Sequence, residues 1–115
     1  MNPLVHLELH TPDERGASAL YATLLRWRPE LIRAGCSSYL ALQTGGAVGG
    51  GIVECDTDHA VWLPYVAVQD VEVMTDRAVA LGASVLLGPR TGAAGRRSVV
   101  RTPSGGEIAF WEPRE

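Results

Sequence analysis

The chain has 115 residues with 46% hydrophobic and 20% charged content and a net charge of −3, the values of an ordinary globular domain. All ten basic residues are arginines and, except for Arg96 and Arg97, they are scattered, so we expect no nucleic-acid partner. No apolar run approaches the roughly 20 residues of a membrane helix and the N-terminus lacks the layout of a signal peptide, so we expect a cytoplasmic protein without a membrane segment.

The first half of the chain predicts a strand, a helix and three more strands. The segment VHLELHT alternates with period two, which places its apolar side chains on one face of a strand and His6, Glu8 and His10 on the other. A Pro-Asp pair then starts a helix in PDERGASALYATLLRW. Three strand-like runs follow, around residues 31–32, in SSYLALQ and in AVGGGIVE, separated by glycine or polar breaks.

The second half repeats this order. WLPYVAV predicts a strand, and DVEVMTDRAVALGA predicts a helix with Val71, Met74, Ala78 and Leu81 facing inward. SVLLG, RRSVVRT and GEIAFWEP predict three more strands. The segment GPRTGAAGRRS is typical of a mobile loop, whose arginines would meet a carboxylate or phenolate of a ligand.

The two halves are related by an internal duplication. An offset of 57 residues sets His6 over Leu63 and Asp13 over Asp70. The polar segment CDTDHA lacks either period, so we expect one domain with modules at 1–55 and 62–115 and a linker at 56–61. The predicted fold class is α+β, with two tandem βαβββ modules forming a cup-shaped mixed sheet.

At this point the sequence resembles the vicinal oxygen chelate superfamily, which includes glyoxalase I, extradiol dioxygenases, methylmalonyl-CoA epimerase and the bleomycin-resistance proteins. The resemblance is carried by HLELHTPDERGASALYATLLRW in the first module, and by LPYVAVQDVEVMTDRAVALGASVLLGP and VVRTPSGGEIAFWEP in the second. It covers nearly the whole chain and implies a cup-shaped binding site, usually in a homodimer.

The resemblance also implies four metal-ligand positions, on the first and last strand of each module. Carried over by position, the first falls on His6. The others fall on Leu63, on Ala109 and in the run 49–51, which is all glycine, and none of these has a donor atom. We therefore predict no cofactor, with a divalent metal at His6 as the alternative.

The opening strand has three interpretations. Successive side chains on the face of His6, Glu8 and His10 are roughly 6.6 Å apart, and the two histidines about 13 Å, too far to meet at one ion. Glu8 with one histidine could share a metal if Glu107, or Asp58 and His59, supplied further donors. Alternatively, His6 paired with Glu8 is a general base near neutral pH, or the three side chains are solvated or hydrogen-bonded to one another.

The remaining cup residues predict a binding site for a flat, apolar molecule. Strand alternation gives an aromatic and apolar lining with few polar anchors, the composition of a small-molecule pocket. The predicted ligand-binding residues are His10, Tyr39, Gln43, Leu63, Tyr65, Glu107, Ala109 and Trp111.

The expected function is metal-independent binding of a small aromatic molecule, for sequestration and antibiotic resistance, as in the bleomycin-resistance branch, or as a carrier. The alternative is a lyase, isomerase or dioxygenase-type enzyme of the same superfamily, either metal-assisted or using His6 and Glu8 as acid and base. The expected partners are the aromatic molecule and a second copy of the chain.

Overall fold

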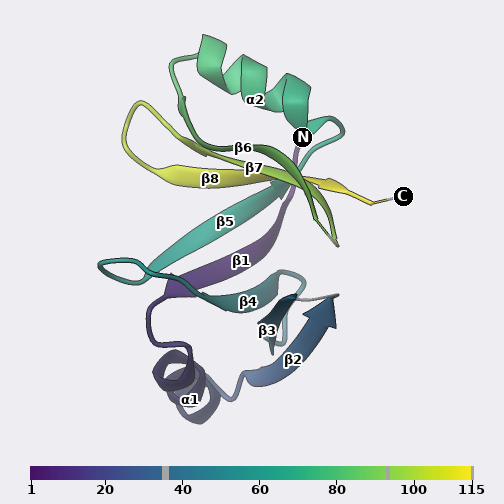
Figure 1. The fold of residues 1–115 in the computed structure, drawn as a ribbon. Helices are drawn as coiled ribbons and strands as arrows, with labels where there is room; N and C mark the ends of the chain where they lie inside the picture. The colour runs from purple at the N-terminus through teal and green to yellow at the C-terminus, as the bar shows by residue number, and fades with distance from the viewer. Residues whose placement is uncertain (35–36, 93, 115) are drawn as a thin grey trace. The chain divides into compact units, whose positions relative to one another are not determined.

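The computed structural model describes residues 1–34, 37–92 and 94–114, and for residues 33, 34, 37 and 38 only the backbone. Its elements repeat one β-α-β-β-β order, as the sequence predicts (Figure 1). In chain order they are β1 (Leu4–Thr11), α1 (Glu14–Leu25), β2 (Arg28–Ala34), β3 (Ser37–Gln43), β4 (Gly49–Glu54), β5 (Val61–Ala67), α2 (Val71–Ala80), β6 (Ser84–Gly92), β7 (Gly95–Arg101) and β8 (Glu107–Pro113).

These elements form two compact units, Val5–Leu63 and Pro64–Glu115, and the second also takes in Met1–Leu4. The N-terminal segment joins the second unit through Ala67, whose backbone N–H donates to the Pro3 carbonyl at 3.0 Å and whose carbonyl accepts from Asn2 Nδ2 at 3.1 Å. Among the described residues, no helix is long and apolar enough to span a membrane.

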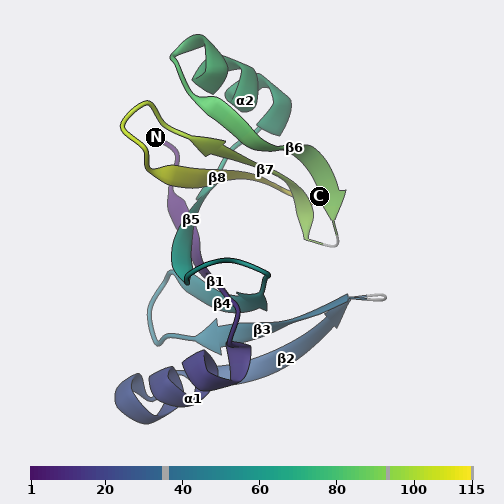
Figure 2. The ribbon, with the colours of Figure 1, turned by 60° about the vertical axis from the view of Figure 1, so that its left-hand side comes forward.

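The first unit is a four-stranded sheet covered on one face by α1, which both views of the ribbon show beside β2 and β4 (Figures 1 and 2). Its strand order is β2-β3-β4-β1, with β1 parallel to β4 and the other pairs antiparallel. The α1 face holds the core, because Leu9, Leu42 and Ile52 are at most 3% exposed and pack against side chains of α1. Asp13 starts α1, since its carboxylate accepts from the N–H of Gly16 at 2.9 Å.

The second unit repeats this arrangement in the order β5-β8-β7-β6, with β5 parallel to β8. α2 covers one face, where Val71 is fully buried and the Thr75 hydroxyl lies 2.7 Å from that of Ser98 on β7. Asp70 starts α2 by accepting hydrogen bonds from two backbone N–H groups, those of Glu72 and Val73.

Two predictions for the second unit are wrong. Residues 88–98 are not a mobile loop in the described part of the chain, because β6 runs to Gly92 and pairs with β7 as a hairpin. Leu81 does not face inward, because α2 ends before it and its side chain is 82% exposed. Glycines misled both predictions. In the first case they suggested a loop, and in the second Gly82 suggested that the helix ends later than it does.

Candidate functional site

The three ionisable residues of β1 form a cluster on the sheet face turned away from α1, with a hydrogen bond between Glu8 and His10 and a longer contact between Glu8 and His6. Leu9 packs on the α1 side, so strand alternation directs His6, Glu8 and His10 to the opposite face. The Nε2 atom of His10 lies 2.7 Å from one Glu8 carboxylate oxygen, and Nε2 of His6 lies 3.5 Å from the other. The Glu8 side chain is 11% exposed and the imidazoles are 26% and 24% exposed, so a nearly buried carboxylate joins two accessible rings.

Glycines of β4 make room for this cluster. β1 and β4 are parallel, with His6 opposite Gly49 and Glu8 opposite Gly51. A β-carbon at Gly51 would lie 3.3 Å from two atoms of the His6 ring, and one at Gly49 would lie 3.2 Å from its Nδ1. The glycine run that supplies no metal ligand therefore provides the surface over which the His6 imidazole lies.

This geometry is suited to proton transfer. Histidine exchanges protons near neutral pH, and a carboxylate that accepts an imidazole N–H orients the ring and stabilises its protonated form. When Glu8 is ionised, His10 donates through Nε2, which makes Nδ1 its basic nitrogen. The interpretation that these side chains are hydrogen-bonded to one another agrees with the structure for Glu8 and His10, whereas His6 lies 3.5 Å from Glu8. The contact between Glu8 and His10 has the length that an oriented general base requires.

The predicted residues of β3 share the face of this cluster. Glu8 and Ala41 both lie opposite Gly51, so Tyr39 and Gln43, two positions away along β3, point to the same side as Glu8. Tyr39 is 36% exposed, and Gln43 is also exposed. The structure thus places five predicted site residues of the first unit on one sheet face: His6, Glu8, His10, Tyr39 and Gln43.

The predicted residues of the second unit share the face of its sheet that α2 does not cover. Tyr65 on β5 and Ala109 on β8 lie opposite each other and are 5% and 0% exposed, whereas Trp111 is half-buried. Glu107, at the start of β8, lies opposite Arg101 and accepts a hydrogen bond from it at 3.4 Å. Leu63, the remaining predicted ligand-binding residue, is 4% exposed in the first unit.

The four-ligand metal site implied by the superfamily does not fit these residues. Leu63 and Ala109 occupy two ligand positions as buried apolar side chains, and the third position holds only glycine beneath the His6 ring. Within residues 1–34, 37–92 and 94–114, no three His, Cys, Asp or Glu side chains are arranged to hold one metal ion. The alternative donors Asp58 and His59 are exposed in the segment before β5.

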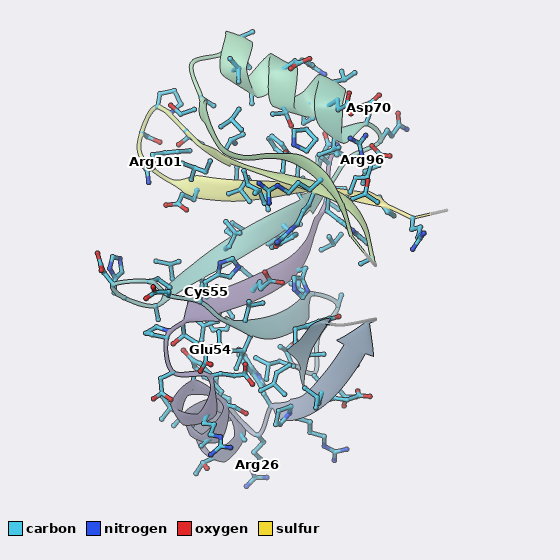
Figure 3. All side chains as sticks on the ribbon, viewed as in Figure 1. Arg26, Glu54, Cys55, Asp70, Arg96 and Arg101 are labelled. Carbon is cyan, nitrogen blue, oxygen red and sulfur yellow. The ribbon has the colours of Figure 1, made fainter. Side chains whose placement is uncertain are left out.

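Arg97 lies on the face of the second unit that α2 does not cover, whereas the sequence predicts it in a mobile loop. Its Nη1 donates a hydrogen bond to the buried Tyr65 hydroxyl at 2.5 Å. Arg96, its neighbour, points to the α2 side, beside Asp70 (Figure 3), and binds Glu72 at 2.5 Å. That hydrogen bond is the main reason why the pKa of Arg96 is raised. The signal in the sequence was the alternation of RRSVVR, which separates the two arginines.

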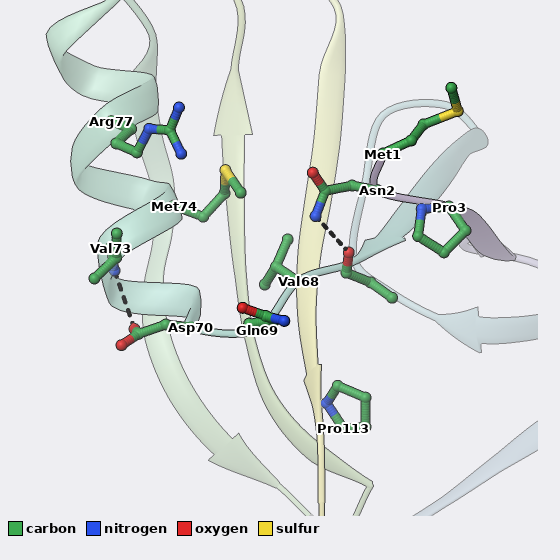
Figure 4. A pocket seen from close by; sticks show the side chains of 11 residues that line it. Met1, Asn2, Pro3, Val68, Gln69, Asp70, Val73, Met74, Arg77 and Pro113 are labelled. Carbon is green, nitrogen blue, oxygen red and sulfur yellow. Dashed lines mark hydrogen bonds between the residues drawn. The ribbon is translucent and has the colours of Figure 1, made fainter.

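Two surface hollows lie in the second unit, and none of the predicted catalytic or ligand-binding residues on the sheet faces lines either. One, of about 570 Å³, lies between the N-terminal segment and the start of α2, with Met1, Gln69 and Met74 among its lining residues (Figure 4). The other, of about 720 Å³, is lined by Arg96 and Glu112, among others. The candidate chemistry therefore lies on the sheet faces rather than in these hollows.

Comparison with known proteins connects this fold to characterised ones. No protein-family model matches the sequence. Two curated proteins, both named "Putative glyoxylase CFP32", from Mycobacterium bovis and Mycobacterium tuberculosis, are 25% identical over 114 residues, which cover 92% of this chain and 44% of theirs. The chain therefore spans less than half the length of these relatives.

Solved structures share the fold at low sequence identity. The hypothetical protein BH1468 from Bacillus halodurans matches with a TM-score of 0.76 at 14% identity, over 99% of this chain and 96% of that chain. Methylmalonyl-CoA epimerase from Mycobacterium tuberculosis matches with 0.70 at 17%, over 97% and 88%. A mutant of 4-hydroxymandelate synthase from Streptomyces coelicolor matches with 0.71 at 21%, over 100% and 40%. These likenesses show that the chain has the α+β fold of these structures, with the two βαβββ modules that the sequence predicts.

Proposed function

We propose that the chain is a metal-independent enzyme that moves a proton on a small molecule, with the cluster of His6, Glu8 and His10 as its acid and base. The observation that carries this proposal is the nearly buried Glu8 carboxylate, which has an accessible imidazole at each of its two oxygens. An isolated surface histidine lacks this support. A base whose ring is held by a third group is the recurring arrangement of acid–base sites.

Two imidazoles on one carboxylate can divide the work of a lyase or an isomerase. One ring accepts a proton from an acidic C–H or O–H group of the substrate, and either the same ring or the other returns a proton to a different atom. Glu8 balances the charge of the imidazolium that exists between these two steps. The names of the relatives, a glyoxylase and an epimerase among them, describe enzymes, which supports catalysis over binding alone.

The test is proton exchange catalysed by the protein. Methylmalonyl-CoA, which the name of one protein with the same fold contains, is incubated with protein in D₂O, and loss of its acidic C–H signal is followed by NMR. Glu8→Gln keeps the shape of the side chain but removes its charge, and we expect the exchange rate to fall by roughly 10²- to 10⁴-fold. His6→Gln and His10→Gln should each lower it as well.

His59→Gln is the matched control, because His59 is an exposed histidine outside the cluster and should be replaceable without loss. Treatment with a chelator should also leave the rate unchanged. Full exchange activity in Glu8→Gln, or its loss on chelation, would contradict the proposal.

A second candidate is stoichiometric binding of a small aromatic molecule, by a cytoplasmic homodimer that confers antibiotic resistance. It is favoured by accessible aromatic side chains on the sheet faces without helices, since Tyr39 is 36% exposed and Trp111 half-buried. Equilibrium dialysis against a bleomycin-type antibiotic distinguishes the two functions. A binder retains about one molecule per chain and releases it chemically unchanged, whereas an enzyme converts many molecules. Light scattering tests the homodimer by measuring the mass of the assembly.

A further inference from the structure

The hairpin of β6 and β7 places two arginines side by side on the face of the second unit turned away from α2. Arg90 and Arg97 are direct partners in the register of the two strands, so their side chains point to the same side. Ser98, next along β7, contacts α2 through Thr75, which fixes the opposite direction for Arg97. Both arginines are exposed.

This pairing places like charges next to each other. Directly opposed side chains of neighbouring strands have β-carbons about 4.5–5.5 Å apart, and like charges at that separation destabilise the pair. Two other arginines of the hairpin, Arg96 and Arg101, bind the carboxylates of Glu72 and Glu107. Arg90 has no ion pair with any residue that the structure describes. A bound anion between Arg90 and Arg97 would turn this repulsion into attraction.

Tyr65 holds one of the two guanidinium groups in place. Tyr65 is 5% exposed, and its hydroxyl accepts a hydrogen bond from Nη1 of Arg97 at 2.5 Å. The buried ring gives Arg97 a fixed anchor, so less side-chain entropy is lost when that guanidinium binds a ligand.

An aromatic ring belongs to the same row of the sheet. Trp111 lies opposite Arg97 on β8, so Arg90, Arg97 and Trp111 are consecutive across three strands. The indole is held by a hydrogen bond from its Nε1 to the carbonyl of Ala94, 3.2 Å away. The row therefore places two cations and an immobilised, half-buried aromatic surface next to one another.

We propose that Arg90, Arg97 and Trp111, with Tyr65 positioning Arg97, form a binding site for the carboxylate of a small aromatic acid. Guanidinium groups bind planar carboxylates through paired N–H···O hydrogen bonds, and the indole stacks on the ring that carries the carboxylate. The site lies within the second unit and requires nothing of the His6–Glu8–His10 cluster, so the two proposals can fail separately.

Isothermal titration calorimetry with benzoate at low ionic strength tests this site. The wild-type chain should bind about one benzoate, and Arg90→Gln and Arg97→Gln should each weaken binding about tenfold or more, since each removes a charge-assisted hydrogen bond. Tyr65→Phe should weaken benzoate binding less than these two changes. Arg97→Lys should bind benzoate as weakly as Arg97→Gln, because a lysine lacks the planar guanidinium group. Arg77→Gln on α2 removes the same charge from the covered side of this unit and should bind like the wild type.

Three further probes separate the contributions to binding. Benzyl alcohol lacks the carboxylate, cyclohexanecarboxylate lacks the aromatic ring, and inorganic phosphate is an anion without either. We expect all three to bind at least several-fold more weakly than benzoate. Equal binding of phosphate, unchanged benzoate affinity in Arg90→Gln and Arg97→Gln, or no benzoate binding by the wild type would overturn the proposal. Circular dichroism confirms that each variant is folded.

Discussion

The position of the His6 ring depends on the absence of a side chain on the neighbouring strand. A β-carbon at Gly51 would come within 3.3 Å of the ring, closer than most real contacts of that kind, so the ring would have to shift by a few tenths of an ångström. Gly51→Ala should therefore move the imidazole away from Glu8 and slow proton exchange by about tenfold, since small displacements of a catalytic group are costly. The exchange rate in D₂O measures this effect.

Gly46→Ala is the control for the change at Gly51. A β-carbon at Gly46 would meet no atom within 4 Å, and the backbone there is not left-handed, so the methyl group should be tolerated. The two variants should show similar melting temperatures if Gly51→Ala acts locally on His6. An exchange rate in Gly51→Ala equal to that in Gly46→Ala would mean that the His6 ring has no part in the reaction.

At the scale of elements, the start of α2 is held by two carboxylates. Asp70 accepts hydrogen bonds from the N–H groups of Glu72 and Val73, at 3.0 and 3.1 Å, and Glu112 of β8 accepts one from Val71 at 2.9 Å. Asp70→Ala should lower the free energy of unfolding by about 1 kcal/mol, the usual cost of losing such a cap. Urea unfolding measures the change. Asp76→Ala, at an exposed position within α2, should cost less, and equal costs would show that the cap contributes nothing.

Local sequence pattern predicted the elements but not the contacts between them. The period-two alternation of VHLELHT and the helix starts at Asp13 and Asp70 depend on a few adjacent residues, so they could be identified without a structure. The hydrogen bond between Arg97 and Tyr65 joins residues 32 positions apart, and it depends on the strand order and register that place β8 between β5 and β7. No local pattern contains that information.

At the scale of the whole molecule, the duplication allowed one half of the chain to predict the other. Each unit has a sheet with its second and third strands antiparallel and its first strand parallel to its last, and each has a helix that begins at an aspartate. The two halves nevertheless differ in chemistry, because the position of His6 holds Leu63 in the second module. A shared fold therefore does not determine the ligand set, which depends on the side chains of each module.

The metal content of the whole chain should be low, because most of the donor atoms that a metal site needs are missing. A divalent ion needs several converging ligands, and three of the four superfamily positions offer none, so we expect well under one ion per chain. Elemental mass spectrometry should measure this on protein purified without nickel or chelator and dialysed against zinc, manganese, nickel and ferrous iron in turn. About one ion per chain, lost in His6→Ala but retained in His59→Ala, would contradict it. The cluster of His6, Glu8 and His10 would then be a metal site, and proton transfer would have to be assigned to a metal-bound group.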